Sequence, residues 1–194
     1  MTLHRRDVVA TLMADRGGLL VVAGLGSTAW DCTAVGDHDL NFPMWGAMGC
    51  AAMLGLGLAL AQPQRRVLVL TGDGEMLMGL GSLATIGVQK PKNLSVVVID
   101  NERYGETGMQ RTHTAAGVNL AKVAQACGFK VARQVRSASQ LAALRAAIHR
   151  PSGPLFAQVK VVAEKVPLVL PPRDGGLLKS RFRKALLGPA ADLD

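Results

Sequence analysis

Two kinds of apolar pattern alternate along the chain. Short, nearly uninterrupted apolar runs are typical of strands buried on both faces of a parallel sheet, and they occupy 19–23, 67–71 and 94–99, while two further strands are expected at 129–135 and 155–162, where polar residues interrupt the run. Segments with helical periodicity or composition lie between them, at 2–15, 29–35, 76–88, 120–127 and 138–149. Strands that alternate with helices predict an α/β fold, a doubly wound parallel sheet with helices on both faces.

The stretch from residue 40 to residue 64 contains no charged side chain. A membrane span would need about 20 consecutive apolar residues, and Pro43 together with four glycines interrupts this stretch. We therefore expect a loop to Trp45, then a Gly/Ala-rich helix over about 47–61. Its small side chains predict close packing against another element or another subunit, and no insertion into a membrane.

Polar residues stand where two predicted strands end. Asp73, between Gly72 and Gly74, follows one strand, and Asn101 follows the next. Neighbouring parallel strands end at one sheet edge, and carboxylate and amide oxygens suit Mg²⁺, which takes further ligands from phosphates. Gly72 and Gly74 allow backbone N–H groups to approach a phosphate, with a helix starting after Gly74. The pattern predicts a Mg²⁺-bound diphosphate; the alternative is Asp73 as an ordinary helix N-cap.

A Gly-rich turn after the first predicted strand leads into another helix. Ser27 and Thr28 lie at the N-terminus of this helix, where hydroxyl and backbone N–H groups can hold phosphate oxygens. An ordinary helix cap would explain the same two residues.

Gly72-Asp73-Gly74, then 26 residues, then Asn101 resembles the signature of thiamine diphosphate (ThDP) enzymes. The resemblance implies that Asp73 and the Asn101 side chain bind Mg²⁺, with the backbone carbonyl of Arg103 as a third ligand. That family often has Ser or Ala after the motif. Here Glu75 follows, which places an anion beside the expected diphosphate and leaves its role open.

A second motif, Trp45-Gly46-Ala47-Met48-Gly49, resembles the aminopyrimidine-binding segment of ThDP decarboxylases and acetohydroxyacid synthases. The resemblance implies that Met48 is the apolar wedge under the bent cofactor, and that the Gly46 carbonyl accepts from its amino group. Met48 as an ordinary core residue is the alternative. Over about 20–165 the chain resembles the small or C-terminal part of sulfopyruvate and phosphonopyruvate decarboxylases, with a small 2-oxoacid as substrate.

Enzymes of this family also need a pyrimidine-binding domain, whose Glu activates the cofactor. One α/β domain accounts for most of the 194 residues, so we expect that Glu to come from a separate subunit, in an α2β2 or larger assembly. Glu106 and His113, in the loop after Asn101, are this chain's candidate acid/base groups. Each is alternatively a solvated loop residue.

Charge is distributed unevenly. The net charge is +8, and residues 130–194 hold twelve Lys/Arg against four Asp/Glu. Aromatic residues are only 4% of the chain, so no stacking platform accompanies the basic excess and nucleic-acid binding is not expected. We expect residues 1–165 to form the ThDP diphosphate-binding domain and 166–194 a basic tail with a short helix near 177–187.

Three widely spaced cysteines and a charged N-terminus without an apolar leader predict a reduced, cytoplasmic protein without a zinc or iron–sulfur site. The leading hypothesis is a subunit of a ThDP-dependent 2-oxoacid decarboxylase that binds ThDP and Mg²⁺. Alternatives are a subunit of a 2-oxoacid oxidoreductase or acyl transferase, a non-catalytic ThDP-binding module, and a flavodoxin-like nucleotide binder.

Overall fold

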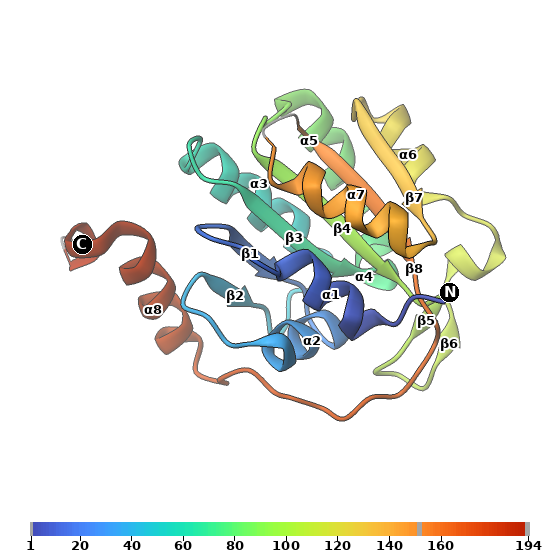
Figure 1. Ribbon diagram of the computed structural model, residues 1–194, viewed down its shortest axis with the longest axis horizontal. Coiled ribbons are helices and arrows are strands. Elements are labelled where there is room, and N and C mark those ends of the chain that lie inside the picture. Colours follow the sequence, from blue (N-terminus) through green and yellow to red (C-terminus); the bar gives the residue numbers. More distant parts are fainter. Residues whose placement is uncertain (1, 151–152, 193–194) are drawn as a thin grey trace.

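The computed structural model describes residues 2–150 and 153–192. Its main sheet has six strands: β1 (Leu20–Ala23), β2 (Asn41–Pro43), β3 (Val67–Gly72), β4 (Leu94–Asp100), β7 (Val131–Val135) and β8 (Leu155–Lys160). All pairs are parallel, in the order β2-β1-β3-β4-β8-β7 (Figure 1). The predicted parallel sheet is confirmed. β2, however, lies where a loop was expected, because a three-residue edge strand is defined by its pairing with β1 rather than by its own sequence.

Helices cover both faces of the sheet. α1 (Arg5–Met13), α2 (Ser27–Val35) and α7 (Ala138–Ile148) pack on one face. The other face carries α3 (Ala51–Ala61), α4 (Asp73–Met78), α5 (Ser82–Gln89) and α6 (Leu120–Ala126). Alternate residues of β3 supply the two cores, Leu68 and Leu70 to the first and Val67 and Val69 to the second. The predicted doubly wound arrangement is therefore present.

Two helix predictions were wrong in their extent. The helix expected over 76–88 is two helices, because the chain bends at Gly79, where an added Cβ would lie 2.1 Å from the carbonyl oxygen of Gly49. α4 also begins at Asp73, so Asp73 and Gly74 belong to its first turn instead of preceding it. The helix expected from 47 starts at Ala51, because Ala47 and Gly49 have left-handed backbones with φ of 57° and 92°.

The expected active-site loop after Asn101 has structure of its own. It contains a two-stranded antiparallel ribbon, β5 (Arg103–Tyr104) and β6 (Gln110–Arg111), and a short 3₁₀ helix, η1 (His113–Ala116). These short elements return the chain over the carboxyl ends of β3 and β4 before α6 begins.

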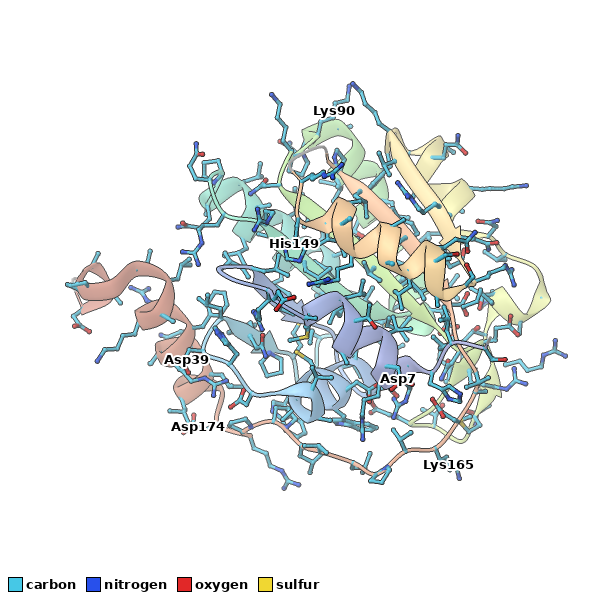
Figure 2. The ribbon with its side chains drawn as sticks, viewed as in Figure 1. Asp7, Asp39, Lys90, His149, Lys165 and Asp174 are labelled. Atoms are coloured by element: carbon cyan, nitrogen blue, oxygen red, sulfur yellow. The ribbon has the colours of Figure 1, made fainter. Side chains whose placement is uncertain are left out.

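The tail ends in α8 (Gly175–Leu187) and η2 (Gly188–Asp192), beside the β2 edge of the sheet (Figure 1). Phe182 meets Phe42 edge-on, with ring centroids 5.6 Å apart, and Arg181 binds both carboxylate oxygens of Asp37 at 2.6 and 2.9 Å. Figure 2 shows Asp39, a second acidic partner of Arg181, next to α8. The short basic helix predicted near 177–187 is thus present, and it packs on the domain.

Across the part of the chain that the structure describes, no helix combines the length and the apolar character needed to cross a membrane.

Candidate functional site

One cavity lies at the carboxyl ends of β1, β3 and β4. It brings together ten of the site residues that the sequence predicted: Ser27, Thr28, Met48, Gly72, Asp73, Gly74, Glu75, Asn101, Arg103 and Glu106. The connection from β1 leads to β2 on one side, and the chain then returns to β3 on the other side. This reversal of strand order is where open α/β sheets bind ligands.

Asp73 is the most strongly perturbed acid of the cavity. Its carboxylate, in a residue only 2% exposed, accepts a hydrogen bond from the Thr112 hydroxyl (2.5 Å), and the Thr114 hydroxyl oxygen lies 3.2 Å from it. Burial raises the pKa of Asp73 to about 6, and the Thr112 hydrogen bond opposes that shift. Sequence reasoning missed both threonines, which lie far along the chain in the loop before α6.

Asp100 and Asn101 face different surroundings although they are adjacent. The fully buried Asp100 carboxylate accepts from Gln158 Nε2 (2.6 Å), Lys160 Nζ (3.0 Å) and the Thr114 hydroxyl (2.8 Å). The Asn101 Oδ1 atom accepts from the Arg103 backbone N–H at 2.9 Å, which orients the side-chain amide. Asp100 therefore already has an ion pair and hydrogen-bond partners within the protein. Asp73 and Asn101 remain as one carboxylate and one amide oxygen, a donor set that suits Mg²⁺ shared with a phosphate.

Glu75 is held between β3 and the turn after β1. Its Oε2 atom accepts from the Thr71 hydroxyl at 2.7 Å, and a Cβ placed on Gly24 would lie 1.8 Å from that oxygen. Burial raises the pKa of Glu75, and the Thr71 hydrogen bond opposes this effect. The Glu75 side chain therefore needs glycine at position 24, so it occupies space that the Gly-rich turn leaves open.

The other glycines of the site differ in what they allow. A Cβ on Gly74 would lie 2.4 Å from the Tyr104 ring, whereas nothing lies within 4 Å of one placed on Gly72. Gly74 thus makes room for Tyr104, and Gly72 leaves backbone open to the cavity.

The two candidate acid/base residues are not equivalent. Glu106 borders the cavity, and its Oε1 atom would lie 1.8 Å from a Cβ on Gly26, the residue that precedes α2. Its carboxylate therefore lies near the N-terminus of α2. His113 is exposed on η1 and does not border the cavity.

The Met48 segment lies at an exposed side of the cavity. Met48 borders the cavity while 37% exposed, and Gly46 is exposed outside it. The Trp45 Nε1–H donates to the Pro172 carbonyl at 2.7 Å, and the Arg173 guanidinium lies 5.8 Å from the Trp45 ring centroid. The C-terminal tail therefore contacts the segment that carries Met48.

Thr28 and Arg5 differ from what the sequence predicted for this site. The Thr28 hydroxyl donates to the Gly24 carbonyl at 2.7 Å, so Thr28 offers its backbone N–H rather than its hydroxyl hydrogen. Arg5, from α1, also borders the cavity and was not predicted. A signal existed, because residue 5 shares a helical face with Val8, Val9 and Leu12, where a charge is unusual.

A family model described as the C-terminal TPP binding domain of thiamine pyrophosphate enzymes matches residues 27–159. Sulfopyruvate decarboxylase subunit beta of Methanothermobacter thermautotrophicus is 36% identical over 192 residues, which are 99% of this chain and 100% of the relative. The same subunit of Methanocaldococcus jannaschii is 43% identical over 126 residues, 64% of this chain and 66% of the relative.

Longer proteins match over part of their length. Phosphonopyruvate decarboxylase of Streptomyces viridochromogenes is 41% identical over 141 residues, 73% of this chain and 35% of the relative. The crystal structure of benzoylformate decarboxylase from Polynucleobacter necessarius superposes with a TM-score of 0.69 at 19% identity, over 87% of this chain and 35% of that one, and so shows the fold.

The chain therefore belongs to the thiamine pyrophosphate enzyme family, as a subunit of the decarboxylase type that carries the cofactor-binding C-terminal domain. This confirms the resemblance predicted from the two motifs, and thiamine diphosphate is the cofactor of the family.

Proposed function

We propose that this chain is the diphosphate- and Mg²⁺-binding subunit of a split decarboxylase that acts on a sulfopyruvate- or phosphonopyruvate-like 2-oxoacid. The observation that carries the proposal is that Asp73, Asn101 and Met48 border one cavity at the strand ends. These residues come from three separate segments, and a nucleotide-binding α/β fold would not need Met48 there. The relatives named sulfopyruvate decarboxylase subunit beta support the substrate class.

Each residue has a defined task in this proposal. Asp73, the Asn101 amide and the Arg103 carbonyl hold Mg²⁺, and the backbone at Gly72 and Gly74 approaches the diphosphate. When bound, ThDP supplies the nucleophilic carbon and the electron sink for loss of CO₂.

The remaining groups orient the cofactor or move protons. Ser27 and the Thr28 N–H bind phosphate oxygens at the start of α2. Met48 would support the cofactor from within the cavity, and the Gly46 carbonyl, exposed beside the cavity, would accept from the cofactor's amino group. Glu106 is the preferred acid/base group because it borders the cavity, whereas His113 would have to approach from outside it.

The partner would cover the side of the cavity next to Met48. Apolar side chains are exposed on α4, at Met78, which is 67% exposed, and along α3, from Met53 and Leu54 near its start to Leu60 near its end. Exposed apolar surface of this kind marks interaction sites. We infer that a pyrimidine-binding subunit docks here and contributes the activating Glu, in an α2β2 or larger assembly.

The test is CO₂ release from a panel of 2-oxoacids, including sulfopyruvate, phosphonopyruvate and pyruvate. This chain is assayed alone and together with a candidate pyrimidine-binding subunit, with ThDP and Mg²⁺ present. We expect turnover only from the pair, and fastest with an acidic 2-oxoacid. Full turnover by the lone chain would overturn the split-subunit proposal. No turnover in any combination would favour a non-catalytic ThDP-binding module.

A further inference from the structure

Arg5 is a buried cation that borders the cofactor cavity. It lies in the first turn of α1 and is only 4% exposed. Among the described residues, its Nε atom has no hydrogen-bond partner. Leaving a buried charged donor unpaired costs free energy. An anion that enters the cavity would lie beside this incompletely paired guanidinium. Arg5 also lies outside residues 27–159, the part matched by the family model.

The acidic neighbours of Arg5 leave this charge only partly compensated. Arg5 Nη1 lies 3.3 Å from Asp31 Oδ2, while Arg6 Nε donates to Asp31 Oδ1 at 3.1 Å. Two guanidinium groups therefore share one buried carboxylate. Glu164 accepts from His4 Nδ1 at 2.9 Å and from the Arg5 backbone N–H, so its hydrogen bonds do not involve the Arg5 side chain.

The position of Asp31 places Arg5 near the expected phosphates. Asp31 is one turn after Thr28 on α2, so the ion pair holds the Arg5 guanidinium close to the N-terminal turn of that helix. The partial positive charge of the helix start and the guanidinium favour the same anion. Asp73 and Glu75 on α4 instead add negative charge to the cavity, which increases the need for a cation beside a diphosphate.

We propose that Arg5 binds the cofactor's terminal phosphate through its guanidinium. This inference rests on the proposed function. Guanidinium binds phosphate with several directed N–H donors, and Asp31 holds the group in place before the cofactor arrives. The competing role, an anchor for the acidic group of the substrate, fits less well because Arg5 is buried and the exposed side of the cavity is at Met48.

The experiment uses the full chain with inorganic pyrophosphate and Mg²⁺ as the probe, titrated by calorimetry. Arg5→Gln is compared with Arg6→Gln, a matched control that also loses a partner of Asp31 but does not border the cavity. We expect Arg5→Gln to weaken pyrophosphate binding about ten- to hundredfold. Arg6→Gln should change it less than about threefold.

Arg5→Lys keeps the charge beside Asp31 and guards against a folding defect. It should melt close to the wild type and still bind pyrophosphate about tenfold more weakly, because an ammonium lacks the guanidinium's fixed set of donors. In the wild-type chain, the NMR signal of the Arg5 Nε–H should shift when Mg²⁺ and pyrophosphate are added together.

The outcomes separate this inference from the proposed function. Suppose that the wild type binds pyrophosphate, that Asp73→Ala does not bind it, and that the Arg5 variants bind it as tightly as the wild type. The inference about Arg5 would then be wrong, while the proposed function would stand. A raised KM for the 2-oxoacid in the assembled enzyme with unchanged pyrophosphate affinity would make Arg5 a substrate residue and overturn it as well. Equal losses of pyrophosphate affinity in Arg5→Gln and Arg6→Gln, or an Nε–H signal that does not shift, would contradict the inference. They would show that Arg5 only pairs with Asp31. No binding by the wild type would overturn both proposals.

Discussion

At the scale of single residues, Asp73 combines a cost to stability with a proposed function. Its pKa in the folded protein is about 6, above the ordinary value of 3.8. The folded state therefore holds the proton more tightly than the unfolded state between these values. Without metal, the free energy of unfolding falls as the pH rises from 3.8 to 6, and the full penalty remains above pH 6. This full penalty lowers the free energy of unfolding by about 2–3 kcal/mol.

We therefore predict that Asp73→Asn raises the melting temperature of the metal-free chain at pH 7.5 and has little effect at pH 4. The same variant should lose Mg²⁺-dependent ThDP binding. Thermal unfolding at the two pH values and calorimetric titration of the assembled complex check the two parts. The exposed Asp7→Asn serves as control. Unchanged ThDP affinity in the Asp73 variant would remove Asp73 from the proposed metal site.

Met48 belongs to the same scale, but its expected effect is kinetic. We predict that Met48→Ala lowers turnover more than it lowers ThDP affinity, because the diphosphate is held at the strand ends while Met48 sets the geometry of the cofactor rings. Removal of this partly exposed side chain should leave folding intact. Steady-state kinetics and a cofactor titration of the assembled enzyme are compared. Equal losses in both would indicate that Met48 is an ordinary packing residue.

At the scale of elements, the Met48 segment and the end of α4 touch through their backbones. A Cβ on Gly79 would lie 2.1 Å from the Gly49 oxygen, whereas nothing lies within 4 Å of one placed on Gly81. Because backbone cannot rotate away as a side chain does, a methyl group at 79 must displace one of the two segments.

We predict that Gly79→Ala shifts the Met48 segment and lowers turnover of the assembled enzyme about tenfold or more, since misplacement by about 1 Å has such effects. Gly81→Ala, two residues away, should retain turnover within about twofold. The measurement is the rate of CO₂ release at saturating ThDP, with melting temperatures of both variants. Similar rates for the two variants would show that the contact between Gly49 and Gly79 does not position Met48.

At the scale of the whole molecule, the exposed apolar side chains of α3 and α4 form the proposed contact with a partner subunit. We predict that Leu60→Glu, on the exposed side of α3, prevents assembly with the pyrimidine-binding subunit, because a charge would be buried at the contact. Pyrophosphate binding by the chain itself should be unchanged. Size-exclusion chromatography with the partner and calorimetry measure the two effects. Lys179→Glu, exposed on α8, is the control; intact assembly of the Leu60 variant would place the partner elsewhere.

The residues at the strand ends were predictable from the sequence, whereas their contacts with distant segments were not. Asp73 and Asn101 follow long apolar strands whose buried state can be read from composition, so their meeting at one sheet edge was predictable. The contacts of Thr112 and Thr114 with Asp73 were not predicted. The two threonines follow Asp73 by 39 and 41 residues in the sequence, and the loop that carries them has no strong periodicity. Gly79 was placed inside a continuous helix, since nothing local to it signals contact with Gly49.

The amino-acid sequence alone determined the alternation of the main strands and helices, which residues stand at the strand ends, and the family. These depend on local apolar periodicity and on short motifs of fixed spacing. Only the tertiary structure decided the pairing of β2, the docking of α8 and the burial of Arg5 beside the cavity. Arg5 meets Asp31 only after α1 and α2 pack on one face of the sheet. Contacts between distant segments depend on how the elements are arranged in space, and that arrangement minimises the free energy of the whole chain rather than of any one segment.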